Sequence, residues 1–286
     1  MVEKGLRFLR TIRELERINM SLNRGQIARS SRNIDLSSPA TWEFSGFSQN
    51  GEDGVIEILL QHLISPNRYF VEIGSSDGLE NNTCWLSVVH RYSGLWVEAD
   101  QVHAQRSLEI FGPLNHGLQV VSQAVTPQTV ASALARSRVK DPDVLSLDVD
   151  SYDYFIAEAI LQAGYRPRVF VLEYNSAFGP DSMLAVPYPA TYPAPRSAAD
   201  KLSYGCSLSA LKALFAKNGY RFVSVERNGV NAFFVDPIEF VSGFLDSVSG
   251  LDFAENYAQL VNFPGGWKEQ WPLVSDRSFA TIEAME

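Results

Sequence analysis

Two carboxylates in this sequence each close a short apolar run. Glu72 ends the first run and is followed by Gly74 and Gly78, and Glu98 ends the next run about twenty residues on. An apolar strand, a glycine turn and a helix present backbone N–H groups to a ligand at a sheet edge. A carboxylate at Glu98 would suit the two ribose hydroxyls of a nucleoside, whereas the alternative is a solvated strand end. The spacing matches neither Gly-x-Gly-x-x-Gly nor a phosphate-binding loop with its lysine.

A second group of acids follows two later apolar runs. Asp148 and Asp150 follow the run that begins at Val144, while Glu173 and Asn175 end the run that begins near Arg168. Adjacent parallel strands lie roughly 4.8 Å apart, so these side chains would meet at one edge. Such oxygens suit Mg²⁺, which would hold a substrate hydroxyl and lower the pKa of that hydroxyl. The alternative is that they cap helices or bind ligand hydroxyls without metal.

Further polar and aromatic residues are candidates for catalysis or substrate contact. Asp150 and His103 are the side chains to test first as a base. The four histidines show no metal-ligand spacing. A polar turn before the first strand and a proline-rich stretch at 175–205 are expected to cover the ligand. The substrate-side candidates are Gln49, Glu52, Asp53, Tyr152, Tyr188 and Tyr192. N-capping of the following helix explains the acids of the polar turn almost as well.

Composition limits the class of protein. The chain has 286 residues, is 45% hydrophobic and carries a net charge of −9, which argues against general nucleic-acid binding. We expect no transmembrane segment and no secretory signal, because no apolar run is long enough for either. Two cysteines without Cys-x-x-Cys spacing are expected to be reduced, so a cytoplasmic location is predicted.

The first residues differ from the acidic remainder. Residues 1–32 carry eight Lys and Arg against three Glu, and apolar residues recur there at three-residue steps from Leu6 to Ile18. This favours a helix packed on its own or a neighbouring subunit, so a homo-oligomer through the arm is expected. A membrane-surface helix is less favoured, because the polar face also carries acids.

Strand-like and helix-like stretches alternate between residues 69 and 173. This alternation predicts an α/β fold, a Rossmann-like, mostly parallel sheet covered by helices on both faces. Strands are expected over residues 69–73, 94–97, 118–122, 144–149 and 168–173. A helix over 207–218 and an antiparallel pair around Asn228-Gly229 follow. The expected organisation is a basic arm and linker (1–45), a catalytic domain (46–236) and a helical C-terminal extension (237–286).

Several blocks together resemble class I S-adenosylmethionine-dependent methyltransferases, most closely the FkbM-like group. The residues that carry the resemblance are FVEIGSSDGLENNT at 70–83, GLWVEAD at 94–100 and VLSLDVD at 144–150. Three shorter blocks add to it: SQNGEDG at 48–54, LEYN at 172–175 and NGVNAFF at 228–234. The resemblance covers roughly residues 47–235.

The resemblance implies a seven-stranded sheet whose last strand is antiparallel. It places Glu98 on the ribose of the cofactor and Asp148 near its amino group or the reacting centre. It implies S-adenosylmethionine as cofactor, with these binding residues: Glu72, Gly74, Ser76, Asp77, Gly78, Asn82, Glu98, Ala99, Ala124 and Asp148. The set Asp148, Glu173 and Asn175 is similar to the metal ligands of catechol-type O-methyltransferases. The lysine that such enzymes carry after the first acid is missing here.

The expected activity is therefore methylation of a hydroxyl on a small molecule or sugar, assisted by Mg²⁺. N-methylation without metal is one alternative. A non-catalytic scaffold that uses the basic arm is the other, although a scaffold has no need of the Glu72, Gly74, Gly78 and Glu98 set.

Overall fold

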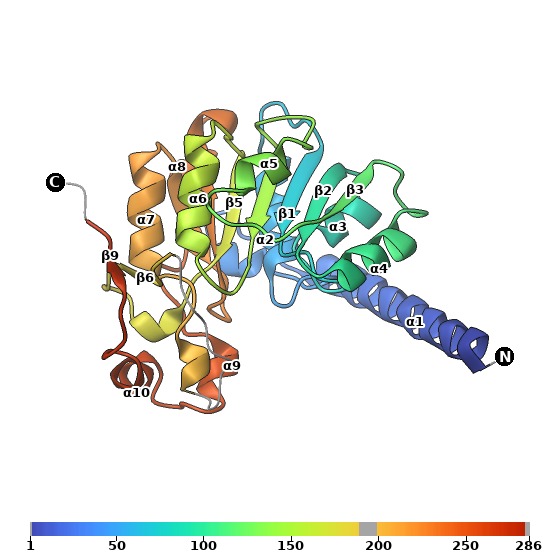
Figure 1. Ribbon diagram of the computed structural model, residues 1–286. Coiled ribbons are helices and arrows are strands. Elements are labelled where there is room, and N and C mark those ends of the chain that lie inside the picture. Colours follow the sequence, from blue (N-terminus) through green and yellow to red (C-terminus); the bar gives the residue numbers. More distant parts are fainter. Residues whose placement is uncertain (1, 189–198, 284–286) are drawn as a thin grey trace.

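A seven-stranded sheet forms the centre of the protein in the computed structural model, which describes residues 2–188 and 199–283 (Figure 1). The strands lie in the order β3-β2-β1-β4-β5-β8-β7. Neighbours from β1 to β5 pair in parallel, while β8 is antiparallel to both β5 and β7. The predicted fold class, with its last strand antiparallel, is confirmed. The bounds are β1 Tyr69–Ile73, β2 Ser93–Glu98, β3 Leu118–Ser122, β4 Val144–Leu147, β5 Val169–Glu173, β7 Arg221–Val225 and β8 Asn231–Val235.

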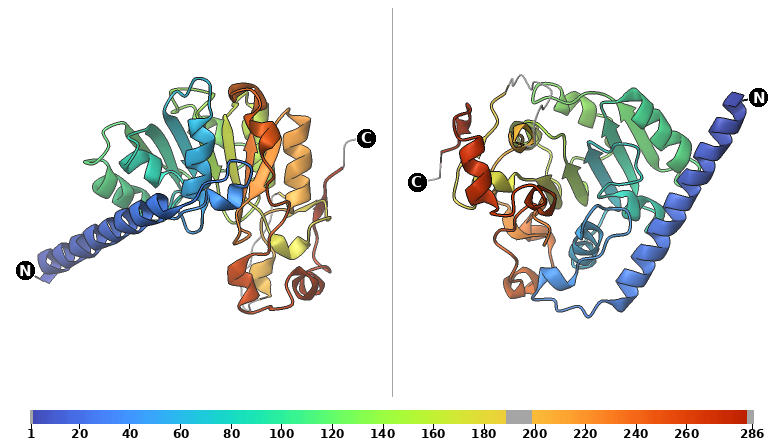
Figure 2. Two further views of the ribbon diagram at one scale, coloured as in Figure 1. Left: turned by 180° about the vertical axis from the view of Figure 1, so that it is seen from behind. Right: turned by 90° about the horizontal axis from the view of Figure 1, so that it is seen from below.

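Helices cover both faces of the sheet, and each face has its own hydrophobic cluster (Figures 1 and 2). The first cluster includes residues of α5 (Val130–Leu134), α6 (Asp153–Gln162) and α7 (Leu208–Lys217). The second includes residues of α2 (Glu52–Gln61), α3 (Cys84–Val88), α4 (Gln101–Phe111) and α8 (Phe244–Ser247). Every residue of β1, β4 and β5 is buried, as a parallel sheet covered on both sides requires.

One strand ends earlier than predicted. β4 stops at Leu147, before the predicted Val149, because Asp150 has a positive φ of 53° and turns the chain away from the sheet. Asp148 therefore follows the strand directly. α5 begins at Val130, after a turn in which Thr126 and Thr129 hydrogen-bond each other.

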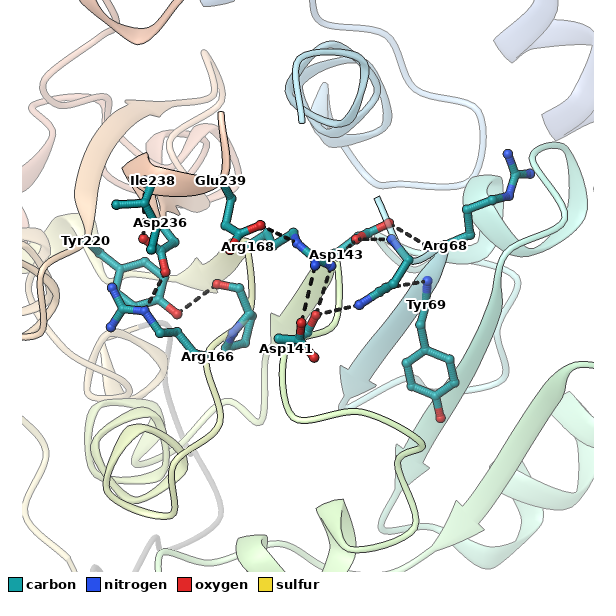
Figure 3. A network of polar contacts seen from close by, with 12 residues as sticks. Arg68, Tyr69, Asp141, Asp143, Arg166, Arg168, Tyr220, Asp236, Ile238 and Glu239 are labelled. Atoms are coloured by element: carbon teal, nitrogen blue, oxygen red, sulfur yellow. Dashed lines mark hydrogen bonds and ion pairs between the residues drawn. The ribbon is translucent and has the colours of Figure 1, made fainter. Parts of the chain in front are cut away.

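A charged network lies at the edge of the sheet where the parallel strands begin (Figure 3). The glycine turn lies at the opposite edge, where β1 ends. The buried guanidinium of Arg168 donates to Asp143 at 2.7 Å, Glu239 at 2.9 Å and Asp141 at 3.2 Å. Asp143 also accepts from the backbone of Arg68 at 2.7 Å. The network joins the starts of β1, β4 and β5 to the chain after β8. Its charged groups hydrogen-bond one another and so hold these strands together.

The N-terminal arm is one long helix, α1 (Val2–Ser31), whose first half extends beyond the body (Figures 1 and 2). Its last turns are tied down by Arg29, which contacts Glu57 of α2 at 2.8 Å. The segment after it, predicted as a linker, is packed: Trp42 and Phe44 are buried in the same cluster as α2.

The C-terminal segment wraps the chain that follows β5. It contains α9 (Tyr257–Leu260), α10 (Trp267–Gln270) and β9 (Ala280–Thr281), and β9 pairs with β6 (Leu184–Ala185). Within the described ranges, no helix is both long and apolar enough to cross a membrane.

Candidate active site

The turn after β1 is built around the buried carboxylate of Glu72. One oxygen accepts from the backbone of Asn82 at 2.9 Å, and the other accepts from the backbone of Thr83 at 3.0 Å and from its hydroxyl. The Asn82 side chain crosses to Ser146 of β4 at 3.1 Å. Glu72 and Asn82 therefore shape the turn, and they would serve a ligand by positioning the backbone around it.

Glycine is required where this turn meets β4. Gly74 has a φ of +87°, and a Cβ there would overlap the carbonyl oxygen of Asp148. Gly78 has a φ of +76°, and a Cβ there would press on the rings of Trp96 and Phe111. Positive φ is costly for other residues. The glycine turn and the first acid of the second cluster thus lie against each other, as neighbouring strand ends.

Glu98 lies at the end of β2 and supports the same turn. Its two carboxylate oxygens accept from the backbone of Ser76 at 2.7 Å and of Asp100 at 2.8 Å. The side chain is half-buried, and each carboxylate oxygen can accept a further hydrogen bond. This is what the ribose of a nucleoside would need. Ser75, next to Ser76, has a buried hydroxyl for which the described part of the chain offers no partner.

Asp77 lies in the same turn, but its carboxylate is engaged. It contacts Arg106 of α4 at 2.9 Å and Arg17 of α1 at 4.0 Å. Arg106 in turn contacts Glu14 of α1 at 2.8 Å. The long helix α1 is therefore fastened to the glycine turn through charged pairs.

Three further predicted residues lie on the outer side of this edge. Ala99 and Ala124 are exposed and follow β2 and β3, which run side by side. His103 is exposed in the first turn of α4, where Asp100 caps its backbone at 3.0 Å. β1 separates β2 from β4, so the structure does not bring His103 to the acids that follow β4.

Asp148, Asp150 and Glu173 form the acidic cluster of the site. One oxygen from each lies within 4.8 Å of the others. Asp148 Oδ1 and Glu173 Oε2 are buried, and no described residue hydrogen-bonds to them. Unpartnered buried oxygens are expensive, so this arrangement calls for a proton, a cation or a polar ligand.

Burial dominates the electrostatics of these acids. Burial, with the charges of Asp150 and Asp153 nearby, raises the pKa of Asp148 to about 8. Burial and the charge of Asp148 raise the pKa of Glu173 well above its usual range, while a hydrogen bond from Tyr204 lowers it. Three like charges this close favour taking up a proton or a cation.

The side chain of Asn175, the third predicted metal ligand, hydrogen-bonds to neighbouring backbone groups. Its amide nitrogen donates to the carbonyls of Leu202 at 2.7 Å and Tyr204 at 3.0 Å, and its oxygen accepts from Ala177 at 3.0 Å. The acids that the structure brings together are Asp148, Asp150 and Glu173. The metal set of Asp148, Glu173 and Asn175 stays a prediction. Asp153 likewise serves the backbone, accepting from Val149 at 2.8 Å.

The polar turn before α2 is mostly structural. Asp53 accepts from three consecutive backbone N–H groups, those of Gly46, Phe47 and Ser48, at 2.7–3.0 Å. Glu52 accepts from the side chain of Asn231 at 2.8 Å, the β8 residue that pairs with Glu173. Gln49 alone is exposed, and it lines a cavity of about 300 Å³ beside α1.

Aromatic residues lie near the acids. The rings of Tyr152 and Tyr188 contact edge to face with centroids 4.8 Å apart. Tyr192 lies outside the described residues. Sequence reasoning missed Tyr204, which hydrogen-bonds Glu173. Its only signal was its place in the aromatic, proline-rich stretch.

Comparison with known proteins gives structural similarity alone. No family model matches the chain, and no curated protein matches its sequence. An S-adenosylmethionine-dependent methyltransferase of Geobacter sulfurreducens, solved with S-adenosylhomocysteine, shares 14% identity over 69% of this chain and 70% of its own, with a TM-score of 0.38. An S-adenosylhomocysteine-bound methyltransferase of Podospora anserina shares 14% identity over 59% of this chain and 71% of its own, with a TM-score of 0.41. An S-adenosylmethionine-dependent methyltransferase of Clostridium acetobutylicum shares 10% identity over 64% of this chain and 89% of its own, with a TM-score of 0.40. Similarities of this size say nothing by themselves about what this chain binds.

Proposed function

We propose that this protein is an S-adenosylmethionine-dependent methyltransferase of the FkbM-like kind that methylates a hydroxyl on a small molecule or sugar. One observation carries the proposal. The glycine turn that would hold the cofactor and the acids that would hold the acceptor meet where Gly74 packs on the Asp148 carbonyl. A donor and an acceptor would thus lie side by side at one sheet edge, as group transfer requires.

The residues at this edge fit the cofactor. Glu98 offers carboxylate oxygens to ribose hydroxyls, and the Gly74–Gly78 turn offers bare backbone and the unpartnered Ser75 hydroxyl. The cofactor would supply a methyl group already activated on sulfur. The chain's part is to orient the acceptor oxygen, to exclude water and to hold the proton that the hydroxyl gives up.

The acids also fit a divalent cation. Asp148, Asp150 and Glu173 offer hard oxygen ligands within 4.8 Å of one another, and two of these side chains carry unpartnered buried oxygens. A cation here would supply positive charge that favours the deprotonated acceptor. Without one, a carboxylate with a pKa raised to about 8, as in Asp148, suits a general base near neutral pH.

Calorimetric titration with S-adenosylhomocysteine, first with Mg²⁺ and then with EDTA, tests the proposal. Micromolar binding supports the cofactor assignment, and tighter binding with Mg²⁺ than with EDTA favours a cation beside it. Equal binding in both conditions favours an acid cluster that works without metal, including N-methylation of an amine. The absence of binding in both conditions rejects the enzyme and leaves the scaffold.

A further inference from the structure

The C-terminal segment is joined to the acidic cluster by a chain of side-chain hydrogen bonds. Its first link is Ser176, which follows Asn175 and accepts from the backbone N–H of Asn256 at 2.8 Å. The Ser176 hydroxyl donates to Gln259 Oε1 at 3.3 Å. Gln259 Nε2 donates to the Tyr204 hydroxyl at 3.3 Å. Gln259 belongs to α9, and Tyr204 precedes α7, so the links come from three separate parts of the chain.

Each bond in this chain has a donor and an acceptor in the structure. The backbone N–H of Asn256 donates to the Ser176 hydroxyl, which donates to the oxygen of the Gln259 amide. In this orientation the NH₂ group of Gln259 faces Tyr204. An NH₂ group can only donate, so the Tyr204 hydroxyl accepts from Gln259 and directs its own hydrogen elsewhere. The acceptor beside it is the carboxylate of Glu173.

The backbone on both sides is held as well. Tyr174 donates from its hydroxyl to the Ala254 carbonyl at 2.6 Å, and Phe178 packs edge to face on Trp271. β9 pairs with β6. These contacts hold the C-terminal segment against the chain that follows β5, where Gln259 of α9 contacts Tyr204.

We propose that Gln259 is a positioning residue which sets Tyr204 as a hydrogen-bond donor to Glu173, so that the C-terminal segment completes the acidic site. One oxygen of Glu173 is thereby bound by Tyr204, and the unpartnered Oε2 is left for the acceptor or the cation. The inference deepens the proposed function, on which its consequence for methyl transfer rests. The hydrogen-bond direction itself does not depend on that function.

A spectroscopic measurement tests the direction without any ligand. The full chain is labelled with ¹³Cζ-tyrosine at one fixed pH, and the Tyr204 signal is identified by its loss in Tyr204→Phe. We expect this signal to move in Glu173→Gln, in Gln259→Leu, which removes the donor, and in Gln259→Glu, which offers only acceptor oxygens. The signal should stay in place in Gln162→Leu, which changes an exposed glutamine at the end of α6.

A Tyr204 signal that ignores both Gln259 substitutions overturns the inference. The Gln259→Glu variant is nearly isosteric and keeps the test open if Gln259→Leu does not fold. A simple packing role would shift the signal in Gln259→Leu but leave Gln259→Glu unchanged, which also overturns it.

Kinetics then relate the direction to the reaction. Tyr204→Phe and Gln259→Leu should each lower kcat about tenfold with little change in the affinity for S-adenosylhomocysteine. The double variant should lose no more than either single one, because both act on the same bond. Tyr257→Phe, an exposed tyrosine of the same α9, is the matched control. Additive losses overturn the inference. If the wild type does not bind S-adenosylhomocysteine, the proposed function is rejected instead. The Tyr204 signal, which needs no ligand, then still tests the role of Gln259.

Discussion

At the scale of single residues, carboxylates at this sheet edge differ in what they bind. Glu72 accepts backbone donors on both carboxylate oxygens. Asp53 accepts three backbone donors on Oδ2, while its Oδ1 is buried and has no partner among the described residues. Both acids hold turns. Glu98 accepts from the backbone but is only half-buried. Asp148 and Glu173 each have a buried oxygen to which no described residue hydrogen-bonds. The number of donors around each acid therefore separates structural acids from those available to a ligand.

Replacing Glu98 tests the ribose contact. Glu98→Ala should weaken binding of S-adenosylhomocysteine more than tenfold, about 1.4 kcal/mol or more, because two hydroxyls lose their acceptor. Calorimetric titration measures the affinity. Glu80→Ala, an exposed acid of the same turn, is the control. An affinity for Glu98→Ala equal to that of the wild type would remove Glu98 from the site.

Asp53 has a pH-dependent contribution to stability whose sign is set by burial. Burial raises its pKa from 3.8 to about 7. The folded state then holds the proton more tightly than the unfolded state, so this contribution to the free energy of unfolding falls as the pH rises from about 4 to about 7 and is constant above. In Asp53→Asn the amide oxygen can still accept the three backbone N–H bonds.

Urea unfolding of Asp53→Asn and the wild type at several pH values measures this contribution. We expect the variant to gain stability relative to the wild type between pH 4 and 7. Asp53→Ala is the control that also removes the acceptor, and it should be destabilised throughout. A difference between Asp53→Asn and the wild type that does not change with pH would contradict the shift.

At the scale of elements, α1 is fastened to the body by charged pairs and still exposes apolar side chains. Charged pairs join it to Asp77 of the glycine turn and to Glu57 of α2. Leu15 is 60% exposed and Ile27 68% exposed. A helix that leaves such residues in water is expected to meet a second surface.

A second copy of the chain is the partner we expect for α1. Leu15→Glu should shift the protein toward the monomer, because a buried carboxylate without a partner opposes association. Sedimentation equilibrium over a range of concentrations measures this. Glu16→Gln, its exposed neighbour, should leave the equilibrium in place. A wild type that is monomeric at every concentration rules out the arm as a dimer contact.

At the scale of the whole molecule, a ligand at the sheet edge should stabilise the entire domain. Binding to the folded state alone adds about 2.7 kcal/mol at a hundredfold excess over Kd. The acids that would hold a cation come from β4 and β5, the centre of the sheet. Cation binding should therefore raise the temperature of global unfolding.

The predicted cation can be tested by thermal unfolding with Mg²⁺ or with EDTA. Mg²⁺ should raise the Tm of the wild type and leave Tm unchanged in Asp148→Asn combined with Glu173→Gln, which lacks two of the ligands. Asp252→Asn, a 92% exposed acid, should respond like the wild type. Equal Tm values of the wild type in Mg²⁺ and EDTA would argue that the cluster holds a proton or an amine.

The sequence by itself determined the layers of this protein and the edge that carries its chemistry. Continuous apolar runs separated by helical patterns are local signals, so they predicted β1 to β5 and placed Glu98, Asp148 and Glu173 at their ends. The tertiary structure alone decided which atoms meet. The amide of Asn175 donates to the carbonyls of Leu202 and Tyr204. Asp150, which has a positive φ, joins Asp148 and Glu173 in the acidic cluster. Gln259 reaches Tyr204 only because the C-terminal segment docks on the chain after β5, a contact between distant residues that no local pattern encodes.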